Sequence, residues 1–240
     1  MVKYVIKRIL ILIPIMLAVS FVVFSILYFN PGDPARIMLG ASAPQEAVEQ
    51  LREELGLNDP FLVQYFRYLS GVLHGDFGTS YRSGQSVSLE IGARLPVTLT
   101  LAGLSILVVA VVGVLLGIIS AVKQYSVLDY VLTVLSMLAS SIPNFWLAMM
   151  MMLFFSLQLG ILPASGVEDG WRSYVMPVIA LSLPPMAEVI RMTRSAMLET
   201  IRQDYIRTAR AKGLMEHIVI WRHALKNALM PIITGIGSNF

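Results

Sequence analysis

The chain has 240 residues, of which 56% are hydrophobic and 14% charged, and its mean hydropathy is +0.72. Soluble domains carry about 25% charged residues, so this composition excludes an ordinary soluble protein and indicates a lipid bilayer. The net charge of +3 reflects basic loops and does not favour a nucleic-acid partner. Because the chain has no cysteine, it can form no disulfide, thiolate metal site or cysteine nucleophile.

The first predicted element is a transmembrane helix. The stretch from Ile9 to Phe29 carries no charge, and at about 1.5 Å per residue it crosses a hydrocarbon core about 30 Å thick. A cleaved signal peptide is the alternative, because Lys3, Lys7 and Arg8 form a basic start. We favour the transmembrane helix, since the apolar run exceeds the roughly 7 to 15 residues of a signal peptide and the Ala-x-Ala-like site at 41–43 lies too far downstream.

The region after this helix, residues 30–96, is polar and is expected to hold two or three short helices. Pro44 to Leu57 combines an acidic face with apolar residues at helical spacing, and Phe61 to Leu73 continues with an aromatic stripe. Such stripes usually belong to a core, so we expect these short helices to pack against the membrane domain. A docking platform for another protein is the alternative.

Residues 97–240 predict a membrane core that contains several apolar segments. We expect membrane spans at these approximate positions: 97–122, 130–159, 173–190 and the start of another at 228. Pro143 should kink the third span of the chain, because proline removes a backbone donor and clashes with the preceding turn. The fourth span is expected to be irregular, since it contains Pro177, Pro184 and Pro185.

Few polar residues lie within these spans. Glu188 and Arg191 stand three residues apart and predict either an intramembrane gate or, as we favour, an interfacial salt bridge. Gly113 and Gly117 form a Gly-x-x-x-Gly pattern, which is a weak motif for close helix packing. The three histidines have no partner at metal-ligand spacing, so we expect no metal site. No residue is assigned to substrate binding.

Loop charges predict the orientation of the chain. Segment 191–226 holds eight Lys and Arg against three Asp and Glu, whereas segment 30–94 holds five against eight. Basic loops stay in the cytoplasm, so the N-terminus and segment 191–226 are expected inside and the polar region after the first helix outside.

The basic segment 204–227 is the most informative part of the chain. Four residues recur at helical spacing and predict a short amphipathic helix: Leu198, Ile201, Tyr205 and Thr208. Gly213 can take a positive φ and end this helix, and a second short helix is expected from Met215 to Arg222. The pattern of helix, glycine turn and helix indicates a docking surface. A solvated basic loop is the alternative.

Tyr205 to Gly213, together with Arg222 to Asn227, resembles the cytoplasmic EAA coupling loop of ABC importer permeases of the oligopeptide, dipeptide and nickel family. Here Arg207-Thr208-Ala209 replaces the usual Glu-Ala-Ala, and Leu225-Lys226 replaces the usual Leu-Pro, as in this subfamily. Further blocks resemble the family's first permease subunit in the same order: Gly32–Pro34, Leu55–Pro60, Gly75–Ser80, Arg94–Leu99 and Ser141–Phe145.

The resemblance implies an all-α polytopic membrane protein with the type I (MetI-like) transmembrane domain of an ABC importer and an EAA-type coupling loop at 198–226. It implies a role in ATPase coupling for these residues: Tyr205, Arg207, Thr208, Ala209, Arg210, Ala211, Lys212, Gly213, Leu214, Arg222 and His223. It also implies a bacterial or archaeal inner-membrane location, and a family pattern that continues into a fifth and sixth span. The implied partners are a homologous permease subunit, two nucleotide-binding ATPase subunits and an extracytoplasmic solute-binding protein.

The predicted function is therefore that of a non-catalytic permease subunit for peptides or similar small solutes. The chain has no G-x-x-x-x-G-K-[ST] phosphate loop, so we expect it to bind no cofactor and the ATPase subunits to use ATP and Mg²⁺. A secondary transporter would usually show an internal repeat with charges at mid-membrane, and neither is visible in the sequence. A channel would need a ring of polar or backbone ligands, which no segment suggests. An intramembrane hydrolase would need paired catalytic residues, whereas the spans offer serines without a histidine or aspartate at depth. Nickel, glutathione or sugar are the alternative substrates.

Overall fold

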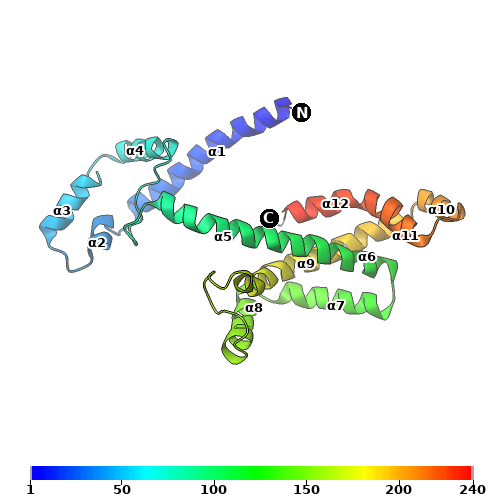
Figure 1. The fold of residues 1–240 in the computed structure, drawn as a ribbon. Coiled ribbons are helices and arrows are strands. Elements are labelled where there is room, and N and C mark those ends of the chain that lie inside the picture. The colour runs from blue at the N-terminus through cyan, green and yellow to red at the C-terminus, as the bar shows by residue number, and fades with distance from the viewer. Residues whose placement is uncertain (1, 239–240) are drawn as a thin grey trace. The chain divides into compact units, whose positions relative to one another are not determined.

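The computed structural model describes residues 2–238, and the chain divides into two compact units, Met1–Pro96 and Val97–Phe240. Within the described residues every regular element is a helix, apart from an isolated antiparallel bridge between Thr79 and Ser86 (Figure 1). The predicted all-α class is confirmed. The described part holds three helices, and one sharply bent helix pair, that are long and apolar enough to cross a membrane: Lys3–Phe29, Val87–Val122, Trp171–Ile201, and Val127–Ser141 with Asn144–Gln158.

The described part of the first unit contains one long apolar helix, three short ones and the first part of α5 (Val87–Val108). The four complete helices are α1 (Val2–Phe29), α2 (Pro34–Leu39), α3 (Gln45–Glu54) and α4 (Phe61–Leu73). The start of α2 follows from the local sequence, because the Asp33 side chain accepts a hydrogen bond from the backbone N–H of Ala35 at 3.1 Å. Pro34 occupies the first helical turn, where its missing N–H costs nothing.

The aromatic face of α4 packs against α1. The Tyr65 ring is buried and meets the Phe21 ring edge to face, with 5.2 Å between the ring centroids. The Tyr65 hydroxyl lies 3.1 Å from the carbonyl oxygen of Leu17, to which it donates, and 3.0 Å from the Ser20 hydroxyl. Aromatic pairs of this geometry stabilise a contact beyond the area that they bury. The stripe that the sequence places on α4 is thus a packing surface.

The remaining helices are α5 (Val87–Val108), η1 (Val109–Gly113), α6 (Val114–Val122), α7 (Val127–Ser141), α8 (Asn144–Met151), η2 (Met152–Gln158), α9 (Trp171–Ile201), α10 (Asp204–Ala211), α11 (Glu216–Ile218), η3 (Val219–Ala224) and α12 (Leu225–Ser238), where η marks a π-helical segment. In the second unit α9 is the central helix, since it contacts α6, α7, α8 and α12 (Figure 1).

Two of these helices are longer than the apolar segments from which they were predicted. The helix predicted over 97–122 begins at Val87, and the one predicted over 173–190 runs without a break from Trp171 to Ile201. Hydropathy marks only the part of a helix that lipid can cover, whereas backbone hydrogen bonds continue through polar residues. Pro96, Pro177, Pro184 and Pro185 lie inside these helices without ending them.

The span predicted over 130–159 is two helices. α7 ends at Ser141, α8 begins at Asn144, and the two axes are bent by 97°. Pro143 stands at this break with φ of −64° and ψ of 135°, an extended conformation that a helix cannot contain. The sequence predicted a kink within one continuous helix. The structure has a complete interruption instead, because the chain leaves the helical conformation at Pro143.

The Gly-x-x-x-Gly face, with Gly113 at the end of η1 and Gly117 in α6, is in close contact with α9. A Cβ atom added to Gly117 would lie 2.6 Å from Cβ of Thr193 and 2.8 Å from the carbonyl oxygen of Ile190, and one added to Gly113 would lie 3.1 Å from Cγ1 of Val189. Only glycine allows the two backbones to approach this closely. The predicted close packing is confirmed.

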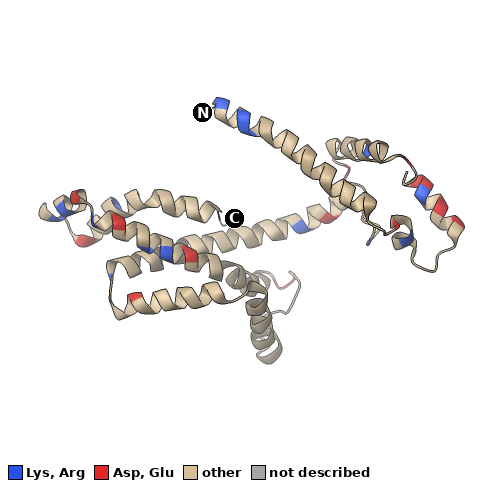
Figure 2. Ribbon diagram, turned by 180° about the vertical axis from the view of Figure 1, so that it is seen from behind, with Lys and Arg blue, Asp and Glu red and all other residues tan. Residues whose placement is uncertain are grey.

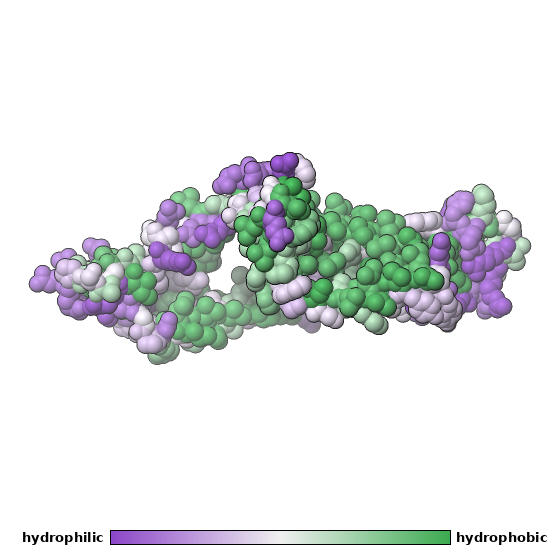
Figure 3. All heavy atoms as spheres, turned by 90° about the horizontal axis from the view of Figure 1, so that it is seen from below, coloured by the Kyte–Doolittle hydropathy of each residue, from purple (hydrophilic) through white to green (hydrophobic). Residues whose placement is uncertain are grey.

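Charged side chains gather on α3 and around α10 and α11, and are sparse along the long helices (Figure 2). The same contrast holds on the surface of the second unit, which is hydrophobic along its long helices and hydrophilic at α10 and α11 (Figure 3). Many large apolar side chains of the long helices are exposed, among them Leu99, Leu107 and Val134. Such a surface suits lipid or a neighbouring membrane helix.

Candidate functional site

The coupling segment, residues 198–226, folds as a helix, a tight turn and a second helix. Gly213 has a φ of 76°, as the sequence predicts. Its N–H donates to the carbonyl of Arg210 at 2.9 Å, and the N–H of Leu214 donates to the carbonyl of Ala209 at 3.4 Å. This pair of bonds is the Schellman arrangement, which ends α10 and reverses the chain within three residues.

The inward face of α10 differs from the predicted one. Ile206 and Ala209 are buried, whereas Tyr205 and Thr208 are exposed. The prediction assumed one helix from Leu198 onward, but α9 ends at Ile201 and α10 restarts at Asp204, which resets the helical register. The buried pair belongs to a hydrophobic cluster that draws on α6, α9, η3 and α12: Ile118, Ala121, Met197, Val219, Ile220, Ala224, Ala228 and Ile232.

In this register Ala209 lies on the inner face of α10. Its side chain is 7% exposed and packs inside the hydrophobic cluster, so it does not lie on the free surface of the turn. The residues of the coupling segment that the structure leaves exposed are Tyr205, Arg207, Thr208, Arg210, Ala211, Lys212, Gly213, Leu214 and Arg222, while His223 is half-buried.

An ion pair closes the turn across the two helices. The Arg210 guanidinium donates to both carboxylate oxygens of Glu216, Nη2 to Oε1 at 2.7 Å and Nε to Oε2 at 3.1 Å. This hydrogen-bonded cation holds the pKa of Glu216 below its ordinary value. Both side chains are exposed, so the pair fixes the geometry of the turn more than it stabilises the fold.

The sequence prediction missed a buried charged network. Asp129 is 2% exposed and accepts two hydrogen bonds from Arg194, at 2.7 Å from Nε and 2.8 Å from Nη2. It also accepts from the Ser120 hydroxyl at 2.5 Å and from the Tyr125 N–H at 3.0 Å. The network therefore joins α6, α7 and α9.

The signal for this network was present in the sequence. Asp129 is the one acidic residue between 91 and 167, within otherwise apolar segments. The Ser126 hydroxyl caps α7 by accepting from the N–H of Asp129 at 3.3 Å, which places the carboxylate in the first helical turn. The span predicted from residue 130 begins just after Asp129, so the prediction assigned this carboxylate to the adjacent loop.

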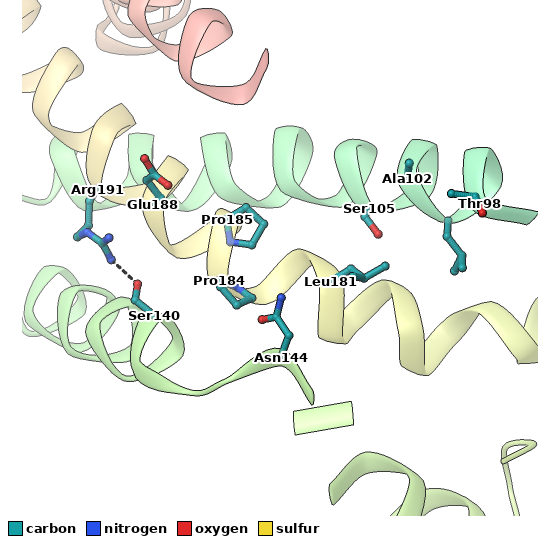
Figure 4. A pocket seen from close by; sticks show the side chains of 11 residues that line it. Thr98, Ala102, Ser105, Ser140, Asn144, Leu181, Pro184, Pro185, Glu188 and Arg191 are labelled. Atoms are coloured by element: carbon teal, nitrogen blue, oxygen red, sulfur yellow. Dashed lines mark hydrogen bonds between the residues drawn. The ribbon is translucent and has the colours of Figure 1, made fainter. Parts of the chain in front are cut away.

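The predicted pair of Glu188 and Arg191 is not formed among the described residues. Arg191 instead donates through Nη1 to the Ser140 hydroxyl at 2.9 Å (Figure 4). The same nitrogen donates to the Ser136 carbonyl at 3.3 Å, and both acceptors are on α7. The carbonyl and hydroxyl groups near the end of α7 attract the guanidinium away from its helical neighbour. Glu188 and Arg191 both line a cavity of about 640 Å³.

Two family models match most of the chain. Residues 113–240 match the family model described as binding-protein-dependent transport system inner membrane component, and residues 1–102 match the N-terminal model of the same kind of membrane component.

Similar proteins include a dipeptide transport system permease of Alkalihalophilus pseudofirmus, 39% identical over 99% of this chain and 79% of the relative. An oligopeptide transport system permease of Bacillus subtilis is 41% identical over 99% and 78%. A glutathione transport system permease of Salmonella paratyphi A is 40% identical over 100% and 78%. The chain belongs to the family of binding-protein-dependent transport system inner membrane components, and it is a multi-pass, non-catalytic permease subunit of an ABC importer.

Proposed function

We propose that this permease subunit imports short peptides and that its coupling segment is the contact through which ATPase subunits drive it. The proposal rests on the observation that α10 has one exposed side and one buried side. Its outer side and the turn at Gly213 are exposed, while Ile206 and Ala209 on its inner side are packed against α9, η3 and α12. A surface of this kind can receive a partner and remain fixed to the membrane helices.

The packing supports a mechanical role. Interiors at crystal-like density transmit displacement instead of absorbing it, so a push on the exposed turn moves the hydrophobic cluster and, with it, α9. The same helix contributes Glu188 and Arg191 to the cavity described above. A displacement of α10 would therefore reach the cavity through a single helix.

The proposed substrate class is short peptides. The similar permeases named above belong to dipeptide, oligopeptide and glutathione systems, and these three substrates share amide bonds with a free amino group and a free carboxylate. Uptake of alanyl-alanine by the complete importer in liposomes tests this assignment, with nickel and a disaccharide as the competing substrates. Uptake of either competitor in place of the dipeptide would reject it.

The proposed assembly contains this chain, a homologous permease subunit, two ATPase subunits that use ATP and Mg²⁺, and an extracytoplasmic solute-binding protein. In this assembly the N-terminus and the coupling segment face the cytoplasm, and residues 30–96 face outward. The charge difference between segments 191–226 and 30–94 supports this orientation, since basic segments stay inside.

Substitution of Gly213 tests the coupling role. A Cβ at this position would meet nothing within 4 Å, so Gly213→Val acts through its φ of 76°, which β-branched residues resist. We expect Gly213→Val to lower peptide uptake per ATP hydrolysed by tenfold or so, whereas Gly213→Asn, whose side chain tolerates a positive φ, retains most of it. Equal uptake per ATP hydrolysed in the wild type, Gly213→Val and Gly213→Asn would show that the turn is only a solvated loop.

A further inference from the structure

The cavity of the second unit is built around the break between α7 and α8. It is lined by residues of α5, of this break and of α9, and its volume of about 640 Å³ lies in the range of small-molecule sites. Ser140 stands just before the break and Asn144 just after it (Figure 4). Helical hydrogen bonds stop at such a break, which leaves backbone polar groups available next to the cavity.

Glu188 brings a charge into this cavity without an ion-pair partner among residues 2–238. It lies 13 residues before the end of α9, which is about 20 Å along the helix. The apolar span predicted over 173–190 ends two residues after Glu188, so this carboxylate lies within the span near one end of it. Ionisable groups at such depth face a water-filled path or a ligand, because lipid does not tolerate them.

Arg191 and Ser105 add a cation and an unused hydroxyl. The Arg191 guanidinium is held by a hydroxyl and a carbonyl of α7, which leaves its charge uncompensated by any carboxylate of the described residues. Ser105 is 1% exposed, has no hydrogen-bond partner among residues 2–238, and lies on the cavity wall formed by α5 (Figure 4). A buried hydroxyl without a partner indicates a group that a ligand completes.

The spacing of the two charges suits a short zwitterion. Residues three apart on a helix have Cβ atoms about 5 to 6 Å apart, and the Glu188 and Arg191 side chains diverge from there (Figure 4). An extended dipeptide spans about 7 Å. An interaction between Glu188 and Arg191 themselves would leave no charge for a ligand, but Arg191 is committed to α7 instead.

We propose that this cavity binds the two termini of a short peptide as it crosses the membrane. Glu188 receives the ammonium group, Arg191 receives the carboxylate, and Ser105 and Asn144 hydrogen-bond to the peptide amide. The assignment rests on the proposed import of peptides and adds the site at which the membrane subunits themselves recognise them.

A thiol reporter at the cavity tests the assignment, since the chain has no native cysteine. Ala102→Cys, which lines the cavity but is not one of the proposed ligands, is introduced into the complete importer in liposomes, and its reaction with a small maleimide is followed without the solute-binding protein. We expect alanyl-alanine to slow the reaction and N-acetyl-alanyl-alanine amide to leave it unchanged. Ser165→Cys, an exposed loop position outside the cavity, is the control and should not be protected by either peptide.

The charges are then removed singly in the Ala102→Cys background. Glu188→Gln or Arg191→Gln should raise the half-protecting concentration of alanyl-alanine about tenfold or more, since each loses a charged hydrogen bond. Ser105→Ala should raise it less, and Glu168→Gln, an exposed loop residue, should not change it. Equal protection by the capped and free peptides, or unchanged protection in Glu188→Gln, would overturn the site.

The outcomes separate this site from the proposed function. If the importer takes up alanyl-alanine while the thiol is not protected, the site is wrong and peptide import stands. If the importer does not take up alanyl-alanine, the proposal of peptide import is wrong, and the proposed peptide site is then wrong as well.

Discussion

Asp129 and Arg194 hold α7 against α9 through two parallel hydrogen bonds, and Ser120 brings α6 into the same network. Arg194→Gln would leave the Asp129 carboxylate buried without its cation. Breaking a buried pair in this way costs about 3 to 5 kcal/mol, and we expect a value near the lower end because the Arg194 side chain is 28% exposed. Chemical unfolding of the detergent-purified importer measures the loss.

A double-mutant cycle separates this ion pair from general damage. Asp129→Asn combined with Arg194→Gln should cost less than the sum of the two single variants, because the second change removes the charge that the first left unpaired. Arg172→Gln, at the exposed start of the same helix, is the matched control and should cost little. Additive costs would mean that the pair contributes no coupling energy.

The titration of Glu216 makes the stability of the turn after α10 depend on pH. Its pKa is lowered chiefly by the hydrogen bonds from Arg210, so the stabilisation of the turn is present above the ordinary pKa of a glutamate and is lost as pH falls through the lowered one. Hydrogen exchange of the amides in residues 204–218 should therefore accelerate in acid relative to the rest of the chain. Arg210→Gln should abolish this acid dependence, and an unchanged profile in that variant would contradict the assignment.

Among the elements, the contact between α6 and α9 depends most on the size of one residue. Gly117→Ala would place a methyl group 2.6 Å from Thr193 Cβ, and such overpacking costs about 1 to 3 kcal/mol. Gly103→Ala is the matched control, because a Cβ on that helical glycine meets nothing within 4 Å. It should be neutral or stabilising, since alanine favours the helix. Equal unfolding midpoints for the two variants would argue against the close contact.

The elements that the sequence predicts well are those set by local chemistry. One residue, Gly213, determines the turn after α10, and two glycines determine the approach of α6 to α9. The register of α10 could not be predicted, because no glycine or proline marks its break from α9 and the burial of Ile206 and Ala209 depends on a cluster of residues from other helices. The Asp129–Arg194 pair joins residues 65 apart in sequence, which only the packing of α7 on α9 brings together.

On the scale of the whole molecule, the proposed orientation predicts which segments an external reagent reaches. Single cysteines at Ser83 and Gln203 are both on exposed positions. An impermeant thiol reagent added to intact cells should label position 83 and spare position 203, and permeabilised cells should show labelling of both. The reverse pattern would invert the topology and exclude the coupling segment from the cytoplasm.

The central claim is that the exposed turn after α10 meets an ATPase subunit. A photo-crosslinking amino acid at Ala211, which is exposed beside Gly213, reports this contact in the assembled importer, and the same group at Ser165 is the control. We predict that irradiation joins this chain to an ATPase subunit from position 211 and not from position 165. Absence of that product from position 211, in an importer that still hydrolyses ATP and takes up peptide, would contradict the account.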